Sequence, residues 1–232
     1  TVAGLGSNQD GTDLRGSSTD QRKAASPTTE DAPAPTPVLV VHPTTFRYLG
    51  PAQPSDPGGM AAIYRDLVAD DARLRQVATD VRVALARGRH CLVLSQWKEH
   101  VRRLAEALAG AADVGTSDPV VLVGGVGVRA RAAAMAQLET AATERQVLLI
   151  ATGPLIGEGF DLPVLDTLFL AAPISFPGRL VQYAGRVLRP WPGKTTAEVH
   201  DYVDVEVPVL KSSLAKRARG YTQLGFPDPR RM

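Results

Sequence analysis

Two arginines stand three residues apart in the stretch Gln182-Tyr183-Ala184-Gly185-Arg186-Val187-Leu188-Arg189. If this stretch is helical, Arg186 and Arg189 share one face and present two guanidinium groups in the same direction. A guanidinium is permanently charged and can bind two phosphate oxygens with parallel hydrogen bonds. Gly185 has no side chain, so a ligand or another backbone can come close there. The pattern indicates a phosphate site, but by itself it fits a solvated basic turn on an amphipathic helix equally well.

A glycine-containing segment precedes the arginine pair and runs Thr152-Gly153-Pro154-Leu155-Ile156-Gly157-Glu158-Gly159-Phe160-Asp161. Gly157 and Gly159 would allow the backbone to approach a phosphate or a sugar. The Thr152 hydroxyl suits a phosphate oxygen, and the Asp161 carboxylate suits a ribose hydroxyl. An ordinary loop with glycines at its tight turns is the alternative. The segment therefore becomes informative only through its distance from the arginine pair.

The elements that must position these residues alternate along the chain. Short apolar runs predict strands, and apolar residues three and four apart predict helices between them. The predicted strands are 38–41, 90–94, 119–123, 146–151, 165–170 and 198–203; the predicted helices are 60–87 with a break near Ala69, 97–108, 128–142, 177–188 and 206–217. Strands that are apolar on both faces and separated by helices predict an α/β fold with a covered parallel sheet. Ligands of such sheets bind beyond the carboxyl ends of the strands, which is where we expect the segment after residue 151 to act.

Composition describes a globular chain without a dominant charge. The 232 residues are 44% hydrophobic and carry a net charge of +2, so no overall basic field favours nucleic acid and any basic surface is local. The single cysteine, Cys91, cannot form an internal disulfide, which fits a reducing cytoplasm. No apolar run approaches the roughly 18 residues of a membrane span, and we expect no membrane partner. Because the chain starts at Thr1, we expect it to be a piece of a longer protein, with processing of the chain as the alternative.

The composition also predicts how the chain is divided. Residues 1–36 hold few large apolar side chains and are predicted to be a disordered lead or linker. Residues 37–65 are predicted to be a connecting strand and loop, 66–220 the main α/β domain, and 221–232 a tail.

The order and spacing of these motifs resemble those of superfamily-2 helicases and translocases over residues of about 80–205. The Gly-Glu-Gly-Phe-Asp segment, the strand after it and the Gln-x-x-Gly-Arg-x-x-Arg stretch resemble motifs V and VI of that family. Cys91 to Trp97 resembles motif IV, and Val123-Gly124-Gly125 resembles the segment after it. The resemblance is closest to DEAD/DEAH-box proteins related to restriction-enzyme motor subunits.

The resemblance implies a RecA-like three-layer sandwich with a mostly parallel central sheet. It implies the second of two motor domains, with ATP and Mg²⁺ held mainly by a first motor domain that acts in cis or in trans. DNA is the expected track, and RNA is possible by the same resemblance.

The resemblance also implies roles for individual residues. Arg186 and Arg189 take the arginine-finger positions, and Gln182 supports them. The residues implied on the nucleotide side are Gly157, Glu158, Gly159 and Asp161; those implied nearer the nucleic-acid backbone are Ser95, Gly124 and Thr152. Many members carry arginine where this chain has Tyr183, which puts a third arginine contact in doubt but not the two fingers.

Two parts of an ATPase are missing from the sequence. The Gly193-Lys194-Thr195 run lacks the earlier glycine of a phosphate-binding loop, follows the arginine pair and precedes a strand, so we interpret it as a turn. No acidic Asp-Glu-x-His-like box ends a predicted strand. We therefore expect no ATP hydrolysis by this chain alone. A trans-acting partner domain and a small Rossmann-like nucleotide-binding domain are the alternatives to a motor domain.

The remaining candidates favour structural roles. Four histidines (His42, His90, His100 and His200) have no metal-ligand spacing and are predicted to be surface or packing residues. Trp97 is predicted to be a core residue. The basic side chains of the last helix, Lys211, Lys216, Arg217 and Arg219, are predicted to be a solvated helix end.

Overall fold

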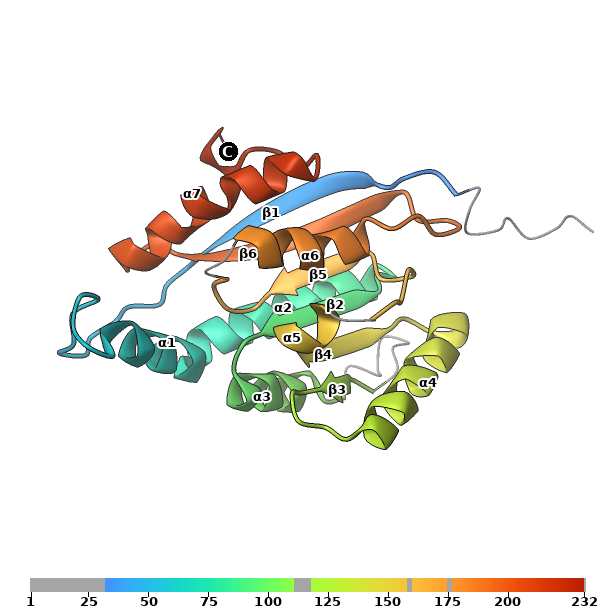
Figure 1. Ribbon diagram of the computed structural model, residues 1–232, viewed down its shortest axis with the longest axis horizontal. Coiled ribbons are helices and arrows are strands. Elements are labelled where there is room, and N and C mark those ends of the chain that lie inside the picture. The colour runs from blue at the N-terminus through green and yellow to red at the C-terminus, as the bar shows by residue number, and fades with distance from the viewer. Residues whose placement is uncertain (1–31, 111–117, 158–159, 175–176, 232) are drawn as a thin grey trace, which may run out of the picture.

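The computed structural model describes residues 32–110, 118–157, 160–174 and 177–231 (Figure 1). Its centre is a sheet of six strands in the order β1-β6-β5-β2-β4-β3. The strands are β1 (Thr36–Thr44), β2 (Cys91–Ser95), β3 (Val120–Leu122), β4 (Leu148–Thr152), β5 (Thr167–Leu170) and β6 (Thr196–Asp204). All neighbouring strands are parallel, which confirms the predicted α/β fold. Residues 1–36 are predicted to be a disordered lead, and residues 1–31 of this segment lie outside the described part of the chain.

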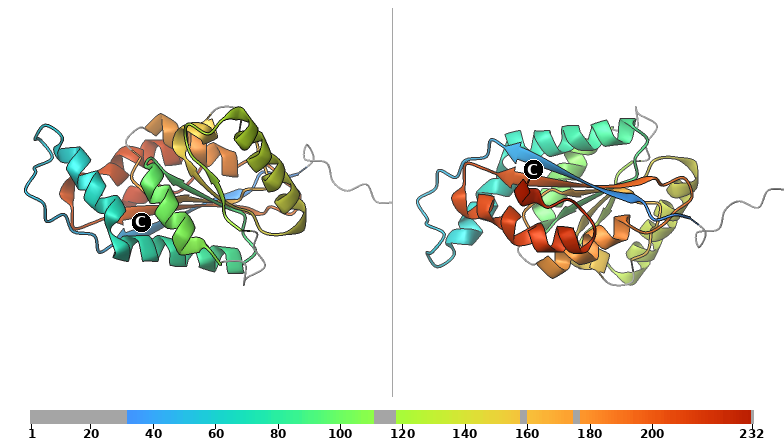
Figure 2. Two further views of the ribbon diagram at one scale, coloured as in Figure 1. Left: turned by 90° about the horizontal axis from the view of Figure 1, so that it is seen from below. Right: turned by 90° about the horizontal axis from the view of Figure 1, so that it is seen from above.

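Helices cover both faces of the sheet and form three layers, as Figure 2 shows. They are α1 (Gly59–Ala69), α2 (Asp71–Ala86), α3 (Lys98–Leu108), α4 (Val128–Glu144), α5 (Gly153–Gly157), α6 (Pro177–Val187) and α7 (Pro208–Gln223), with a 3₁₀ turn at Pro229–Arg231. Helices α2 and α3 pack on one face of the sheet. Helices α4 to α7 pack on the other face, where the arginine pair lies. Among the described helices, none is long and apolar enough to cross a membrane.

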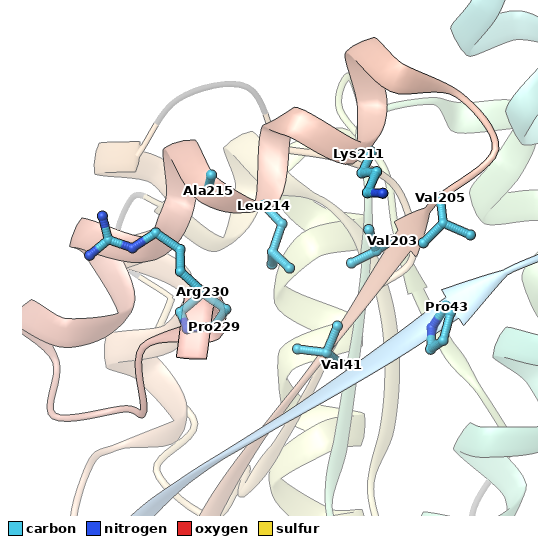
Figure 3. A pocket seen from close by; sticks show the side chains of 9 residues that line it. All are labelled: Val41, Pro43, Val203, Val205, Lys211, Leu214, Ala215, Pro229 and Arg230. Carbon is cyan, nitrogen blue, oxygen red and sulfur yellow. The ribbon is translucent and has the colours of Figure 1, made fainter. Parts of the chain in front are cut away.

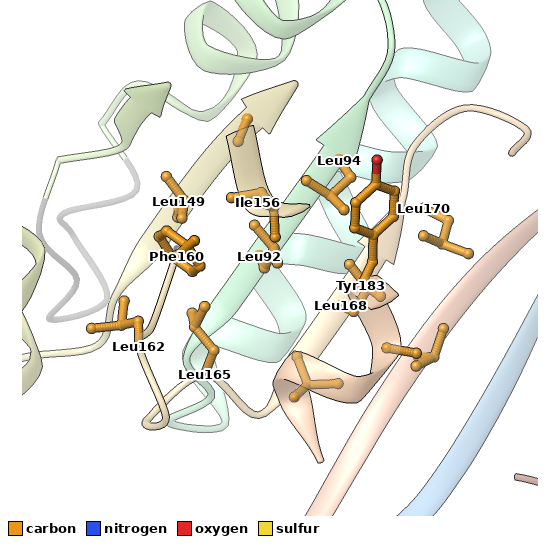
Figure 4. Close-up of a cluster of buried hydrophobic side chains, with 14 of the residues drawn as sticks. Leu92, Leu94, Leu149, Ile156, Phe160, Leu162, Leu165, Leu168, Leu170 and Tyr183 are labelled. Carbon is orange, nitrogen blue, oxygen red and sulfur yellow. The ribbon is translucent and has the colours of Figure 1, made fainter. Parts of the chain in front are cut away.

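Alternation of side chains explains why the strands are apolar along their whole length. In β2, Cys91 and Val93 enter the core beneath α2 and α3, whereas Leu92 and Leu94 enter the core beneath α5 and α6. Figure 4 shows the second core, in which Tyr183 of α6 packs over the leucines of β2 and β5. The sheet is therefore buried on both faces, and α6 is fixed by its apolar side.

Two helix boundaries have clear local causes. Asp70 is extended (φ −70°, ψ 118°), and its side chain accepts a hydrogen bond from the backbone N–H of Arg73 at 2.7 Å. Asp70 thus begins α2 as an N-cap, which accounts for the predicted break near Ala69. At the other end of the chain, α7 continues six residues beyond the predicted end at 217. The added turns bury Tyr221, whose ring meets the ring of Phe226 edge to face, with the two ring centroids 6.0 Å apart.

Candidate functional site

The arginine pair is held by two consecutive residues of a distant segment. Arg186 lies in the last turn of α6, and its Nη1 donates a hydrogen bond to the carbonyl oxygen of Phe160 at 2.6 Å. Arg189 forms an ion pair with Asp161. Because α6 ends at Val187, one residue before the predicted end at 188, Arg189 lies beyond the helix, and the condition for two guanidinium groups on one helical face is not met. The two arginines are brought together instead by their neighbouring anchors.

The charges of this cluster suit an anion. Burial and the positive charge of Arg189 lower the pKa of Arg186, while the carboxylate of Asp161 acts in the opposite direction. The side chain of Arg189 is 37% exposed and that of Asp161 is 65% exposed, so the pair is open to solvent and to ligands. Two guanidinium groups that are close enough to lower a pKa, with a single carboxylate as their charged partner, would gain from a phosphate group beside them.

Helix α6 presents a smooth outer face next to the pair. Its buried side consists of Leu180, Tyr183, Ala184 and Val187. On the outer side, a Cβ atom added at Gly178 or Gly185 would meet nothing within 4 Å, and Gln182 between them is exposed. Another domain can therefore approach the helix backbone along this face, up to the arginines.

Tyr183, the departure from the family pattern, points away from this face and into the core (Figure 4). Burial raises the pKa of its hydroxyl. A Cβ atom added at Gly153 would lie 2.3 Å from the Tyr183 hydroxyl oxygen, so the glycine that begins α5 makes room for this ring. Tyr183 therefore fixes α6 against α5 and is not positioned as a substitute for a third arginine contact.

The three residues predicted near nucleic acid lie together at the carboxyl ends of β2 and β4. Ser95 and Thr152 are paired in register, and the backbone N–H of Gly124 donates to Oγ1 of Thr152 at 3.0 Å. Both hydroxyl groups are buried. Ser95 Oγ accepts from the backbone N–H of Trp97 at 3.3 Å and lies 3.0 Å from Nδ1 of His100. These hydroxyl groups therefore shape the strand ends and are turned away from solvent.

Lys98, which no sequence motif singles out, is an exposed cation beside these strand ends. It is the first residue of α3, and its ammonium would lie 3.5 Å from a Cβ atom added at Gly125. Gly125 has a φ of +93°, a conformation that favours glycine. The available signal in the sequence was a basic residue at the start of the helix that follows Ser95.

The structure separates two residues, Thr152 and Asp161, that the sequence pattern places in one loop. Thr152 ends β4 at the carboxyl edge of the sheet and leads directly into α5. Asp161 belongs to the segment that leads to the start of β5. At the end of this segment, the carbonyl oxygens of Leu165 and Arg189 both accept hydrogen bonds from the ammonium of Lys194, so the segment lies beside the residues that follow α6. The expectation of one site beyond the carboxyl ends is therefore wrong for Asp161, which joins the arginines. Gly157 ends α5, and Glu158 and Gly159 lie outside the described residues.

Other basic and histidine side chains have structural positions. Arg217 is only 2% exposed and binds both carboxylate oxygens of Asp201, so the prediction of a solvated helix end is wrong for this residue. His42 and His200 lie 2.9 Å apart, between Asp80 and Glu198. Within the described residues, no group of three or more His, Cys, Asp or Glu side chains is arranged to hold a metal ion.

A groove of about 470 Å³ lies apart from both predicted sites, between the ends of β1 and β6 and helix α7 (Figure 3). It is lined by Val41, Pro43, Val203, Val205, Lys211, Leu214, Ala215, Pro229 and Arg230. None of these residues belongs to the arginine pair or to the carboxyl ends of β2 and β4, so the groove does not define either site.

No protein-family model matches the sequence, and neither does any curated protein. Solved structures do match the fold. T4 UvsW has a TM-score of 0.58 at 15% identity, over 83% of this chain and 40% of that chain. The E. coli DEAD-box protein SrmB, solved bound to regulator of ribonuclease activity A, has a TM-score of 0.50 at 15% identity, over 81% of this chain and 85% of that chain. The C-terminal part of the Fun30 ATPase domain has a TM-score of 0.49 at 13% identity, over 59% of this chain and 42% of that chain.

The chain therefore has a RecA-like α/β fold, which it shares with the matched parts of UvsW and SrmB. It spans less than half of the UvsW and Fun30 chains that it matches.

Proposed function

We propose that this domain is the second motor domain of an ATP-dependent helicase or translocase. The single observation that carries the proposal is the anchoring of Arg186 and Arg189 on the consecutive residues Phe160 and Asp161, beside the open glycine face of α6. This arrangement offers two guanidinium groups on a surface that another domain can approach. It fits a phosphate group held by a first motor domain.

The residues of this domain fit only the terminal phosphate of ATP and the part of the nucleotide that faces this domain. Arg186 and Arg189 would bind the terminal phosphate, and Asp161 would keep the guanidinium of Arg189 oriented through Nη1. Gln182 and the segment of Gly157, Glu158 and Gly159 would border the same nucleotide. A first motor domain, in cis or in trans, would hold most of the ATP and its Mg²⁺. Bound there, the nucleotide supplies the phosphoryl group for transfer to water.

The arginines act on charge that develops during phosphoryl transfer. Positioned cations stabilise the transferring group and the leaving oxygen most strongly in the transition state. Arginines brought in by a second domain meet the phosphate only when the two domains close, so they stabilise the transition state more than the open, ATP-bound state. This domain would thereby couple closure to hydrolysis.

The carboxyl edge of the sheet would form part of the track for a nucleic-acid strand, with DNA favoured over RNA. Ser95 and Thr152 would position the strand ends, and Gly124 would allow the backbone of the nucleic acid to come close. Lys98 would supply the positive charge. Contacts of this kind go to phosphates and give little sequence preference.

The test is steady-state ATP turnover of the full-length protein with Arg186→Ala or Arg189→Ala. We expect kcat to fall by about 10³-fold or more, with little change in ATP affinity, because an arginine finger contributes about 10³–10⁵ to turnover. Lysine at either position should restore little activity, since it lacks the planar fork. Arg75→Ala is the matched control, because Arg75 is an exposed arginine on α2, on the opposite face. Wild-type turnover in both alanine variants would refute the proposal.

A further inference from the structure

Lys194 is a buried lysine whose ammonium is surrounded by backbone carbonyl groups. The residue is 8% exposed. Its Nζ donates hydrogen bonds to the carbonyl oxygens of Pro163 at 3.0 Å, Leu165 at 2.6 Å and Arg189 at 2.9 Å. An ammonium has three N–H groups, so these three acceptors use all of them. Lys194 is therefore unavailable as a phosphate-binding lysine, although it stands in a Gly-Lys-Thr run.

A tight turn directs this side chain inward. Gly193 has a φ of +81°, and the backbone N–H of Lys194 donates to the carbonyl oxygen of Trp191 at 3.0 Å. Strand β6 begins two residues later, at Thr196. The turn thus reverses the chain between the arginine pair and β6 and places the ammonium against the backbone of Arg189, just after α6.

A lysine is an expensive residue at this position. Among the described residues, no carboxylate lies within ion-pair distance of its Nζ, and its three partners are uncharged. Burial lowers the pKa of Lys194 to about 8; Asp166 opposes this effect, and Arg89 and Arg189 add to it. Burying an ammonium costs free energy that an apolar side chain would not, and perturbed groups of this kind concentrate at functional sites.

The bonds of Lys194 join the two segments that position the arginines. Residues 160–165, here called the anchor loop, supply the partners of Arg186 and Arg189 through Phe160 and Asp161. The same loop supplies two of the three carbonyl groups that bind Lys194. The third carbonyl belongs to Arg189 itself. One ammonium therefore fixes the backbone of Arg189 against the loop that holds both guanidinium groups.

We propose that Lys194 is the positioning residue of the arginine pair, which holds Arg189 and the anchor loop in the geometry needed for phosphoryl transfer. This inference rests on the proposed function. A misplacement of about 1 Å can cost about 10²-fold in rate, so a clamp on the backbone of an arginine finger has a catalytic consequence without touching the substrate.

The clamp depends on the charge of the amine. A neutral amine keeps two N–H groups and must release one carbonyl, so turnover should fall as the pH rises through about 8. The charged groups that face Lys194 are Asp166 before β5, Arg89 before β2, and Arg189 after α6. His90 also faces it, but burial and the charges of Lys194 and Arg89 lower the pKa of His90, so it stays neutral across this range.

The experiment measures kcat and the KM for ATP between pH 6.5 and 9.5 in the full-length protein. Lys194→Gln presents an uncharged amide with two N–H groups and mimics the neutral amine. Lys194→Met removes all three hydrogen bonds. We expect kcat at pH 7 to fall about 10-fold in the first variant and about 100-fold in the second, with KM changed less than about twofold. Both variants should lose the decrease near pH 8 that the wild type shows. Lys211→Met, at an exposed lysine of α7, is the matched control and should behave as wild type.

A double-mutant cycle separates this inference from the proposed function. If Lys194 acts through Arg189, Lys194→Met should cost little in a protein that already carries Arg189→Ala. Loss of activity in Arg189→Ala with normal kcat in both Lys194 variants would overturn the inference alone. Normal activity in Arg189→Ala would overturn the proposed function first. Should Lys194→Met fail to fold, Lys194→Gln and the wild-type pH profile still decide, because a flat wild-type profile from pH 7 to 9.5 overturns the clamp.

Discussion

Asp161 binds the guanidinium of Arg189 across 28 residues of sequence, in an ion pair that remains partly open to solvent. The carbonyl oxygen of the preceding residue, Phe160, accepts a hydrogen bond from Arg186. Adjacent residues therefore hold both arginines, and the chain can present them together even though only Arg186 lies in α6.

Removing the carboxylate of Asp161 tests this relationship. In the full-length protein, we expect Asp161→Ala to lower kcat about tenfold, because Arg189 loses the group that orients it. The free energy of unfolding should change by less than about 1 kcal/mol, since partly exposed ion pairs contribute little to stability. Steady-state kinetics and a thermal melt provide the two measurements.

The sequence alone indicates a different role for Asp161, as an acceptor for a ribose hydroxyl. That role predicts a raised KM for ATP at an unchanged kcat. It also predicts that wild type prefers ATP to 2′-deoxy-ATP and that Asp161→Ala loses this preference. Kinetics with both nucleotides therefore distinguish the two roles, and a pure KM effect would contradict the orienting role.

Lys98 should contribute to the binding of single-stranded nucleic acid. We expect this domain to bind an oligo(dT) strand weakly, with an affinity that falls as salt is added. Replacing Lys98 by alanine should reduce the slope of log K against log salt concentration by about 0.7, the value for one phosphate contact on a single strand. Lys216→Ala on α7 is the charge-matched control. Equal slopes for wild type and Lys98→Ala would exclude a phosphate contact by this residue.

His100 should make the domain less stable in acid. The imidazole is 1% exposed, and burial, with Arg73 and Arg103 nearby, lowers its pKa to about 3. The unfolded chain protonates this histidine near its ordinary pKa of about 6.5, so the unfolded state binds more protons between these two values. The contribution of neutral His100 to the free energy of unfolding is therefore fully present above pH 6.5. It decreases as the pH falls toward 3, by about 2 kcal/mol at pH 5.

Melting temperatures between pH 7.5 and 5 check this prediction. His100→Asn keeps a polar group near Ser95 but cannot titrate, so its melting temperature should fall less steeply with acid than that of wild type. Some decrease should remain, because the pKa values of His42 and His90 are also lowered by burial. Identical slopes for the two proteins would show that His100 does not carry the effect.

Arg217 should be essential for stability and not for binding. Its Nε and Nη2 bind the two carboxylate oxygens of Asp201 at 2.9 and 2.8 Å, and the hydroxyl of Tyr221 donates to the same carboxylate at 2.6 Å. Arg217→Met leaves a buried carboxylate without its cation, which typically costs about 3–5 kcal/mol. Chemical denaturation provides the measurement. Lys216→Met, at the exposed neighbour of Arg217, is the control. If Arg217→Met lowers the free energy of unfolding no more than Lys216→Met does, the burial of this pair is contradicted.

Local patterns in the sequence were sufficient for the order of the elements. The apolar run from Cys91 to Leu94 predicted β2 because each residue is buried on one face or the other of a covered sheet. The break near Ala69 was predictable because helix periodicity weakens there, and Asp70 supplies the cap. The grouping of Ser95 and Thr152 followed from the motif order, since parallel strands end at the same edge.

Contacts across the fold decided the rest, because no local pattern records which distant segment an element meets. The periodicity of α7 does not distinguish Arg217 from its exposed neighbours, and only packing against β6 places Asp201 beside it. Thr152 and Asp161 are close in sequence, yet Thr152 lies at the carboxyl edge of the sheet and Asp161 lies beside the arginine pair.

The sequence by itself therefore determined the RecA-like α/β fold and the residue types of the candidate site. The tertiary structure alone decided that Asp161 holds Arg189 and that Lys194 points inward to three carbonyl groups. The physical reason is the same in each case. Burial periodicity is a property of a short segment, whereas the partner of a charge is set by the packing of segments far apart in the chain.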